Sequence, residues 1–113
     1  MTEFVPKTET PYALVGFARP KPERAAELRE LLLSFVAPTR SEPGALEYHF
    51  HEDTNEPGTF VFYEVWRSKD DLDRHLALPH MKRFWDNRMD YLRQDLEIRW
   101  LTMHSPYPRP VAA

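Results

Sequence analysis

Residues 45–67 read ALEYHFHEDTNEPGTFVFYEVWR, and this stretch contains the clearest structural signal in the chain. Residues 45–52 alternate between apolar and polar side chains, and residues 59–67 are rich in β-branched and aromatic side chains; both patterns are typical of strands. Between them, residues 53–58 contain proline and glycine and predict a turn. We therefore predict two antiparallel strands joined as a β-hairpin.

The second strand of this hairpin is apolar or aromatic on both faces. Its faces carry Phe60, Phe62 and Trp66 on one side and Val61, Tyr63 and Val65 on the other. Such a strand fits a sheet that is covered by helices on one face and by another layer on the second. Because a monomer would expose several large apolar side chains on that second face, we predict that the sheet of another copy covers it, as a homodimer.

The segments before the hairpin predict a strand and then a helix. Residues 12–19 (YALVGFAR) are apolar and partly β-branched and predict a strand, and Pro22 suits the first turn of a helix. The apolar residues that follow recur at helical spacing: Leu28, Leu31, Leu32, Phe35 and Val36. We expect Pro38 to disturb or end this helix before a turn at residues 41–44.

The segments after the hairpin predict more helix and a last strand. Ser68 is a good N-cap, and Asp71 at the third helical position completes a pair that resembles a capping box. We expect Leu72, His75 and Leu76 to share one face of this helix. Pro79 restarts the helix, and we expect its inner stripe to hold Met81, Phe84, Trp85, Arg88, Met89 and Leu92. Residues 96–104 alternate again and predict a strand.

The predicted element order is β-α-β-β-α-β, which is typical of a ferredoxin-like α+β fold with a four-stranded antiparallel sheet. A chain of 113 residues lies in the usual range for one domain. We expect that domain at residues 12–104, after a flexible polar segment at residues 1–11. Three prolines predict an extended arm at residues 105–113.

Composition excludes several classes of protein. The net charge is −3 and the 15 Lys and Arg are scattered among acids, so we expect no nucleic-acid partner. The chain has no cysteine, which excludes disulfides and thiolate metal sites and favours an intracellular compartment. No signal peptide is evident and no apolar run approaches the ~20 residues of a membrane span, so we expect a cytoplasmic protein without a membrane partner.

Aromatic residues are more abundant than a single small core needs. They make up 13% of the chain, as three Trp, seven Phe and five Tyr. Extra aromatic area on a small domain usually serves a subunit interface or a ligand pocket. We therefore expect one or both.

Two ionisable residues fall at positions that we expect to be buried. Glu64 shares a strand face with Phe62 and Trp66, and a buried carboxylate requires a partner, which His75, His49 or a backbone amide could supply. His75 lies on the apolar stripe of its helix. It is either a core histidine bonded to Glu64 or the backbone, or a general base at a pocket wall. Spacing alone favours the core histidine.

Motifs for metal and nucleotide cofactors are weak or missing. His49, His51 and Glu56 match the His-x-His-x4-Glu pattern of metal-binding cupins, but cupins are all-β and this chain has strongly periodic helices. We therefore expect no metal site. The sequence contains no glycine-rich phosphate loop and no Gly-x-Ser-x-Gly motif, so we expect no nucleotide cofactor.

Residues 39–84 contain a set of short motifs that resembles a known family. These are Thr39-Arg-Ser-Glu-Pro-Gly44, Tyr48, Phe60-Val-Phe-Tyr-Glu-Val-Trp66, Leu72-x-x-His75 and Pro79-His80-x-x-x-Phe84. The set resembles the antibiotic biosynthesis monooxygenase family of the dimeric α+β barrel superfamily. The resemblance implies a homodimer with a pocket between sheet and helices in each subunit. Several members of that family oxidise phenols or quinols to quinones with O2 and without flavin, metal or haem, while related members isomerise sugars or degrade haem.

The resemblance leads to an expected site. A cofactor-free oxygenase needs a base that converts the phenol to its electron-rich anion, and a dry aromatic cavity. We expect His75 to be that base with Glu64 orienting it, and we expect no cofactor and no metal. The substrate-binding residues that we expect are Trp66, Tyr48, His49, Phe62, His80 and Phe84. The partners would be a small aromatic substrate and O2.

Three questions stay open at this level. The register of the hairpin decides whether Tyr48 or His49 neighbours Glu64, because a slip by one residue exchanges the two faces. The protein is alternatively a non-catalytic small-molecule-binding dimer. It is alternatively an isomerase that moves protons between His75 and Glu64.

Overall fold

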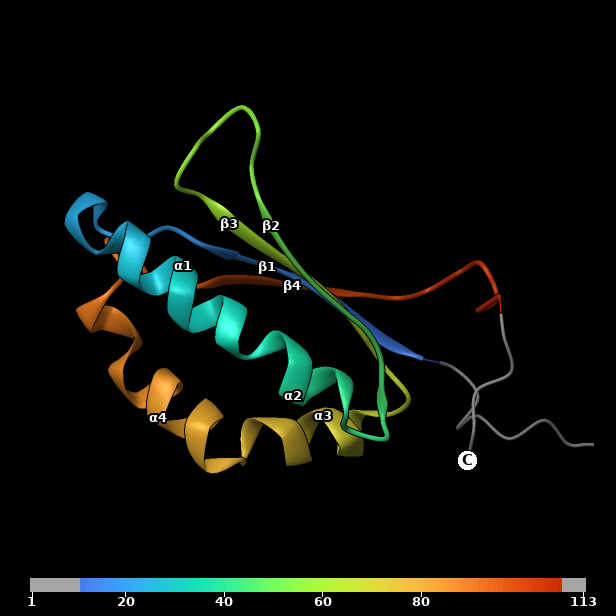
Figure 1. Ribbon diagram of the computed structural model, residues 1–113. Coiled ribbons are helices and arrows are strands. Elements are labelled where there is room, and N and C mark those ends of the chain that lie inside the picture. Colours follow the sequence, from blue (N-terminus) through green and yellow to red (C-terminus); the bar gives the residue numbers. More distant parts are fainter. Residues whose placement is uncertain (1–10, 109–113) are drawn as a thin grey trace, which may run out of the picture.

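The computed structural model describes residues 11–108, which form one antiparallel sheet with helices on one face (Figure 1). The strands are β1 (Tyr12–Ala18), β2 (Ala45–Glu52), β3 (Phe60–Trp66) and β4 (Glu97–Leu101). The helices are α1 (Ala25–Ser34), α2 (Val36–Arg40), α3 (Lys69–Leu76) and α4 (Pro79–Asn87), with short 3-10 turns at Pro22–Arg24 and Arg88–Asp90. The strand order is β2-β3-β1-β4, and every neighbouring pair is antiparallel. The predicted ferredoxin-like α+β fold is confirmed.

The hairpin register answers the question left open by the sequence. Tyr48 lies opposite Glu64, and His49 lies opposite Tyr63. A bulge between Ala45 and Glu47 shifts the pairing near the start of β2. Tyr48 and Glu64 therefore face the helices together, while His49 faces away from them.

The first helical region is interrupted at Phe35, three residues before the Pro38 at which we expected it. Helix α1 ends at Ser34, and Pro38 lies inside the short helix α2 rather than at the end of the first helix. As the third residue of α2, Pro38 occupies the first turn, where a backbone N–H has no intrahelical acceptor. The proline is therefore compatible with the helix, and Leu28, Leu32 and Phe35 all belong to the buried core.

The second helical region also differs in part from the prediction. Ser68 caps α3 as expected, because its hydroxyl accepts a hydrogen bond from the Asp71 N–H. In α4, Met81 and Phe84 are buried, but Trp85 is 44% exposed. Met89 is also exposed, because α4 ends before it. The predicted inner stripe was therefore wrong for Met89, while Trp85 is only partly covered.

The turn before β2 is attached firmly to the start of α3. Gly44 lies so close to Asp71 that a Cβ at this position would overlap the aspartate side chain. The Gly44 carbonyl also accepts a hydrogen bond of 2.8 Å from the Arg67 N–H. Arg67 donates two hydrogen bonds, of 2.8 and 2.9 Å, to the Asp71 carboxylate, which Arg74 also contacts. We call Gly44, Arg67, Asp71 and Arg74 the Gly44–Asp71 clamp.

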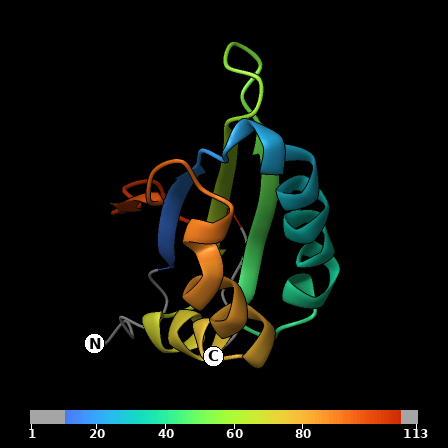
Figure 2. The same cartoon turned by 90° about the vertical axis from the view of Figure 1, so that its left-hand side faces the viewer.

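The helices cover one face of the sheet: all of them lie on the same side of it in Figure 1, and α4 lies in front of the strands in Figure 2. The other face carries partly exposed apolar side chains from β1 and β3, namely Val15, Phe17, Val61 and Tyr63, and the exposed Leu101 of β4. These residues alternate with the buried ones that face the helices.

Two expected segments fall largely outside the described residues. Of the predicted flexible segment at residues 1–11, the structure describes Pro11 alone, and of the predicted arm at 105–113 it describes residues 105–108, which contain neither helix nor strand. Within residues 11–108, every helix is too short or too polar to span a bilayer.

Candidate functional site

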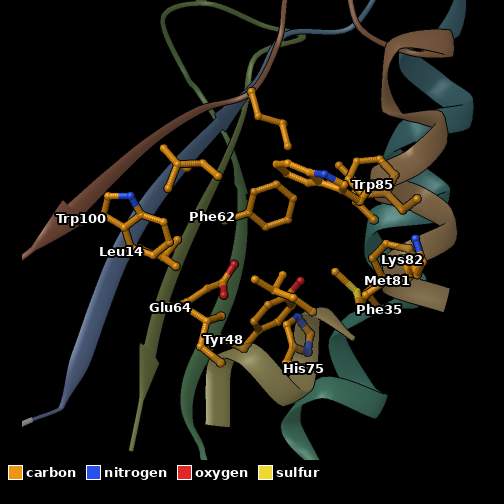
Figure 3. Close-up of a pocket in the computed structure, with 17 residues that line it drawn as sticks. Leu14, Phe35, Tyr48, Phe62, Glu64, His75, Met81, Lys82, Trp85 and Trp100 are labelled. Atoms are coloured by element: carbon orange, nitrogen blue, oxygen red, sulfur yellow. The ribbon is translucent and has the colours of Figure 1, made fainter. Parts of the chain in front are cut away.

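A cavity of about 400 Å³ lies between the sheet and the helices (Figure 3). Strands β1, β3 and β4 form one wall, and α3 and α4 form much of the other. Its walls are dominated by aliphatic and aromatic side chains, among them Leu14, Phe35, Phe62, Leu72, Met81 and Phe84. A cavity of this size and character is suited to a small organic molecule.

Three polar groups gather at one end of this cavity. Tyr48 of β2, Glu64 of β3 and His75 of α3 lie together there, while Phe62 and Trp85 lie toward the other end (Figure 3). They come from three elements that the hairpin and the capped helix α3 bring together. A ligand in the cavity would meet hydrogen-bonding groups at one end and apolar surface along most of its length.

Glu64 is a carboxyl group with one weak partner. Its side chain accepts a hydrogen bond of 2.9 Å from the Trp66 indole N–H. Burial raises the pKa of Glu64 to about 7; the Trp66 hydrogen bond acts in the opposite direction, and the nearby charge of Glu42 adds to the rise. Glu64 is therefore protonated in a large fraction of molecules near neutral pH and is able to donate a hydrogen bond to a ligand.

His75 is 1% exposed and bonds to a residue that the sequence did not suggest. Its Nδ1 lies 2.8 Å from a carboxylate oxygen of Glu42, in the turn after α2. The expected hydrogen bond with Glu64 was wrong, because Glu64 bonds to Trp66 and His75 to Glu42. Burial lowers the pKa of His75, while Glu42 raises it and a charge on His80 lowers it. The imidazole is therefore neutral at physiological pH, which is the form that accepts a proton.

Tyr48 contributes a neutral hydroxyl group. Its side chain is buried, and its ring lies 5.9 Å from that of His75 in an edge-on arrangement. Burial, and then the charge of Glu64, raises the pKa of Tyr48 well above its usual range. The hydroxyl remains protonated, so it serves as a hydrogen-bond donor or acceptor.

The other expected binding residues divide into those at the cavity and those away from it. Phe62 and Phe84 line it. Trp66 is fully buried and lies behind the wall, where the centre of its ring is 4.7 Å from that of His75 and the two rings are tilted by 38°. His49 lies on the far face of the sheet, bonded to Glu47, because β2 alternates. His80 is also away from the cavity lining, with its ring against Phe35.

Several residues at the cavity were missed. Glu42, which bonds to His75 without lining the cavity itself, appeared only inside the motif at residues 39–44, and it lies 33 residues from His75 in sequence, so no local pattern linked the two. Leu76, Trp85 and Trp100 line the cavity while being 44%, 44% and 56% exposed, which places them at its open side. For Trp100, alternation along β4 with Ile98 was a usable signal.

Residues that could bind a metal do not cluster in the described part of the chain. No group of three or more His, Cys, Asp or Glu side chains among residues 11–108 has metal-binding geometry. The cupin-like histidines instead take protein partners: His49 bonds to Glu47 and Arg40, and His51 contacts the Val61 carbonyl.

Comparisons with known proteins agree with one another. Residues 11–87 match the family model described as antibiotic biosynthesis monooxygenase. The chain is 35% identical over 99 residues to the uncharacterized protein sll1783 of Synechocystis, covering 88% of this chain and 67% of that protein. It is 35% identical over 71 residues to a protein of Mycobacterium tuberculosis named "Putative monooxygenase Rv0793", covering 63% of this chain and 69% of that protein.

Solved structures show the same relationship. The crystal structure of PA3566 from Pseudomonas aeruginosa superposes with a TM-score of 0.80 at 31% identity, covering 88% of this chain and all of that one. The structure of Rv0793 superposes with a TM-score of 0.80 at 28% identity, covering 85% of this chain and 97% of that one. The chain therefore belongs to the antibiotic biosynthesis monooxygenase family.

Proposed function

We propose that the protein is a cofactor-independent monooxygenase that oxidises a small hydroxylated aromatic, a phenol or quinol, to a quinone with O2. The observation that carries this proposal is the division of the cavity into an apolar, aromatic body and one polar end formed by Tyr48, Glu64 and His75. Membership of the family supports it.

The polar end supplies the groups that this chemistry needs. The neutral His75 removes the proton of the substrate hydroxyl, which leaves an electron-rich phenolate. Tyr48 and protonated Glu64 donate hydrogen bonds to the substrate oxygens and hold the ring in place. The apolar walls, including Phe62 and Phe84, exclude water and keep the anion poorly solvated and therefore reactive toward O2.

The atoms and electrons balance differently for the two kinds of substrate. For a phenol with a free para carbon, one oxygen atom of O2 enters the ring and the other leaves as water with two hydrogens from the substrate. For a quinol, two electrons and two protons pass to O2 and give hydrogen peroxide, so no oxygen atom enters the ring and the enzyme acts on this substrate as an oxidase. Both routes begin with the same deprotonation.

We also propose that the protein is a homodimer, formed through the sheet face that lies away from the helices. The partly exposed Phe17, Val61 and Tyr63 and the exposed Leu101 on that face support this proposal. Light scattering is expected to report twice the chain mass of 13.4 kDa. A stable monomer would contradict the dimer.

The test of the oxygenase is O2 uptake by chelator-treated protein with a panel of hydroquinones and polyphenols. We expect uptake above the uncatalysed rate and, for phenols, one atom from ¹⁸O2 in the quinone. His75→Ala should lower kcat by about 10²-fold or more, because it removes the base. The control His104→Ala changes an exposed histidine away from the cavity and should keep full activity. Absence of uptake over the whole panel, or full activity in His75→Ala, would refute the proposal.

An isomerase is the second candidate, because Glu64 and His75 both lie at one end of the cavity and have shifted pKa values. Protonated Glu64 would give a proton to a substrate carbonyl while His75 takes one from the adjacent carbon. Incorporation of deuterium from solvent without O2 consumption would favour this candidate. Saturable binding without any product would favour a non-catalytic binding protein.

A further inference from the structure

We propose that Glu42 is the positioning residue of His75: its carboxylate holds the imidazole in the tautomer that presents Nε2 as a base to the cavity. The catalytic consequence rests on the proposed function, whereas the effect on the histidine itself does not.

The geometry of the pair assigns the two ring nitrogens. Nδ1 of His75 lies 2.8 Å from Glu42 Oε2, and a carboxylate accepts hydrogen bonds, so Nδ1 carries the proton. No residue of the described chain bonds to Nε2, and His75 lines the cavity. Nε2 is therefore the nitrogen with a free lone pair, available to a ligand.

The backbone of Glu42 is fixed on both sides. Its N–H donates to the Thr39 carbonyl at 3.0 Å, and its carbonyl accepts from the Ala45 N–H at 3.0 Å. Two residues further on, Gly44 is packed against Asp71 at the start of the helix that bears His75. The turn and α3 are thus joined at two points, so the backbone that bears Glu42 is held next to the helix that bears His75.

Glu42 also stabilises the charge that the proposed reaction creates. The substrate O–H bond breaks, an Nε2–H bond forms, and His75 becomes an imidazolium whose Nδ1–H points at the Glu42 carboxylate. Other ionisable groups near His75 are Tyr48 on β2, Glu64 on β3 and His80 on α4. Of these, Tyr48 stays neutral and Glu64 bonds to Trp66, so Glu42 is the group that meets the imidazolium directly.

The same chain contains a matched control. Glu47 and His49 form a second Glu–His pair at 2.9 Å, on the sheet face away from the cavity. Glu47→Gln therefore changes the same kind of contact without touching the proposed site.

The experiment compares Glu42→Gln, Glu42→Ala and Glu47→Gln by ¹⁵N NMR of the histidines and by steady-state kinetics. In Glu42→Ala we expect the Nδ1–H fraction of His75 to fall. In Glu42→Gln the amide oxygen still accepts from Nδ1 but the charge is lost, so the pKa of His75 and the acid limb of the pH–kcat profile should move down. With an active substrate, kcat should fall at least about tenfold in both variants, with KM nearly unchanged. Glu47→Gln should leave all of these readings as in the wild type.

Two results would overturn the inference: an unchanged His75 tautomer in Glu42→Ala, or an unchanged or higher His75 pKa in Glu42→Gln. If Glu42→Ala does not fold, the isosteric Glu42→Gln decides alone. If no substrate of the panel is oxidised, the oxygenase proposal fails, while the NMR readings still decide whether Glu42 controls His75.

Discussion

The Gly44–Asp71 clamp and the polar end of the cavity each contain an enclosed carboxyl group, and the two behave in opposite ways. Asp71 is 5% exposed and bonds to two arginines and to Ser68, and these partners, Arg67 first, hold its pKa well below the usual range. Glu64 has one uncharged donor, the Trp66 indole, and burial raises its pKa to about 7. A fully paired carboxylate stabilises the fold, whereas an under-paired one beside a cavity is available for chemistry.

The two regions also share one turn. Glu42 of that turn reaches His75 at the cavity, and Gly44 packs against Asp71 in the clamp. A rigid structural contact therefore lies two residues from the contact that orients the proposed base. Substitutions in the two regions are therefore expected to change the free energy of unfolding, and its dependence on pH, in different ways.

The largest effect is expected at the clamp itself. Gly44→Ala adds a Cβ that would overlap Asp71, so the turn or α3 must shift, and we expect a loss of about 3 kcal/mol in the free energy of unfolding. Urea denaturation measures this loss. The control is Gly16→Ala, whose Cβ would meet its nearest neighbours at 3.9 Å, and it should change the stability by less than about 1 kcal/mol. Equal effects of the two substitutions would show that the clamp is not tightly packed.

The second effect concerns the pH dependence of stability at the cavity. The pKa of Glu64 rises from 4.5 to about 7 on folding, so the folded state binds the proton more tightly and loses stability as the pH rises through this window. The expected loss is about 2 to 3 kcal/mol. Glu64→Gln keeps an acceptor for Trp66 and carries no charge, so it should be more stable than the wild type above pH 7 by this amount.

The comparison with Glu64→Gln is needed because His75 acts in the opposite direction. Its pKa is lowered on folding, so its contribution is lost as the pH falls through 6.5. The difference between wild type and Glu64→Gln cancels this contribution. If the difference in the free energy of unfolding between the two proteins did not change from pH 4.5 to 8, the pKa of Glu64 would not be raised on folding.

The smallest of the three effects is the contribution of the Asp71 carboxylate to the stability of the clamp, which is lost at low pH. Asp71→Asn removes the charge that Arg67 and Arg74 contact, and we expect a loss of about 2 kcal/mol at neutral pH, moderated because Arg74 is largely exposed to solvent. The pKa of Asp71 is lowered on folding, so its contribution is present above pH 3.8 and disappears as the pH falls below that value. Thermal unfolding of both proteins between pH 2 and 7 measures the difference. If Asp71→Asn were equally destabilising at low pH, the loss would come from packing and not from the charge of Asp71.

Much of the fold could be predicted because its signals are local. Alternation along residues 45–52 put Tyr48 and His49 on opposite faces but left open which of them faces the cavity, and the Ser68–Asp71 pair marked the start of α3. Prediction failed for Met89, because helical spacing does not show where α4 ends. Of the expected site, Tyr48, Glu64 and His75 do meet at the cavity, while His49 and His80 lie away from its lining.

The sequence by itself determined the order of strands and helices, which residues of each hairpin strand share a face, and the presence of ionisable residues on apolar surfaces, since these depend on periodicity and on capping between near neighbours. The tertiary structure alone decided which partners those ionisable residues have. Glu42 and His75 are 33 residues apart, and they meet because the clamp holds one turn against one helix. The pKa of a buried group depends on the burial and on the charges that the whole fold places around it, so the difference between Asp71 and Glu64 arises only when the chain has folded.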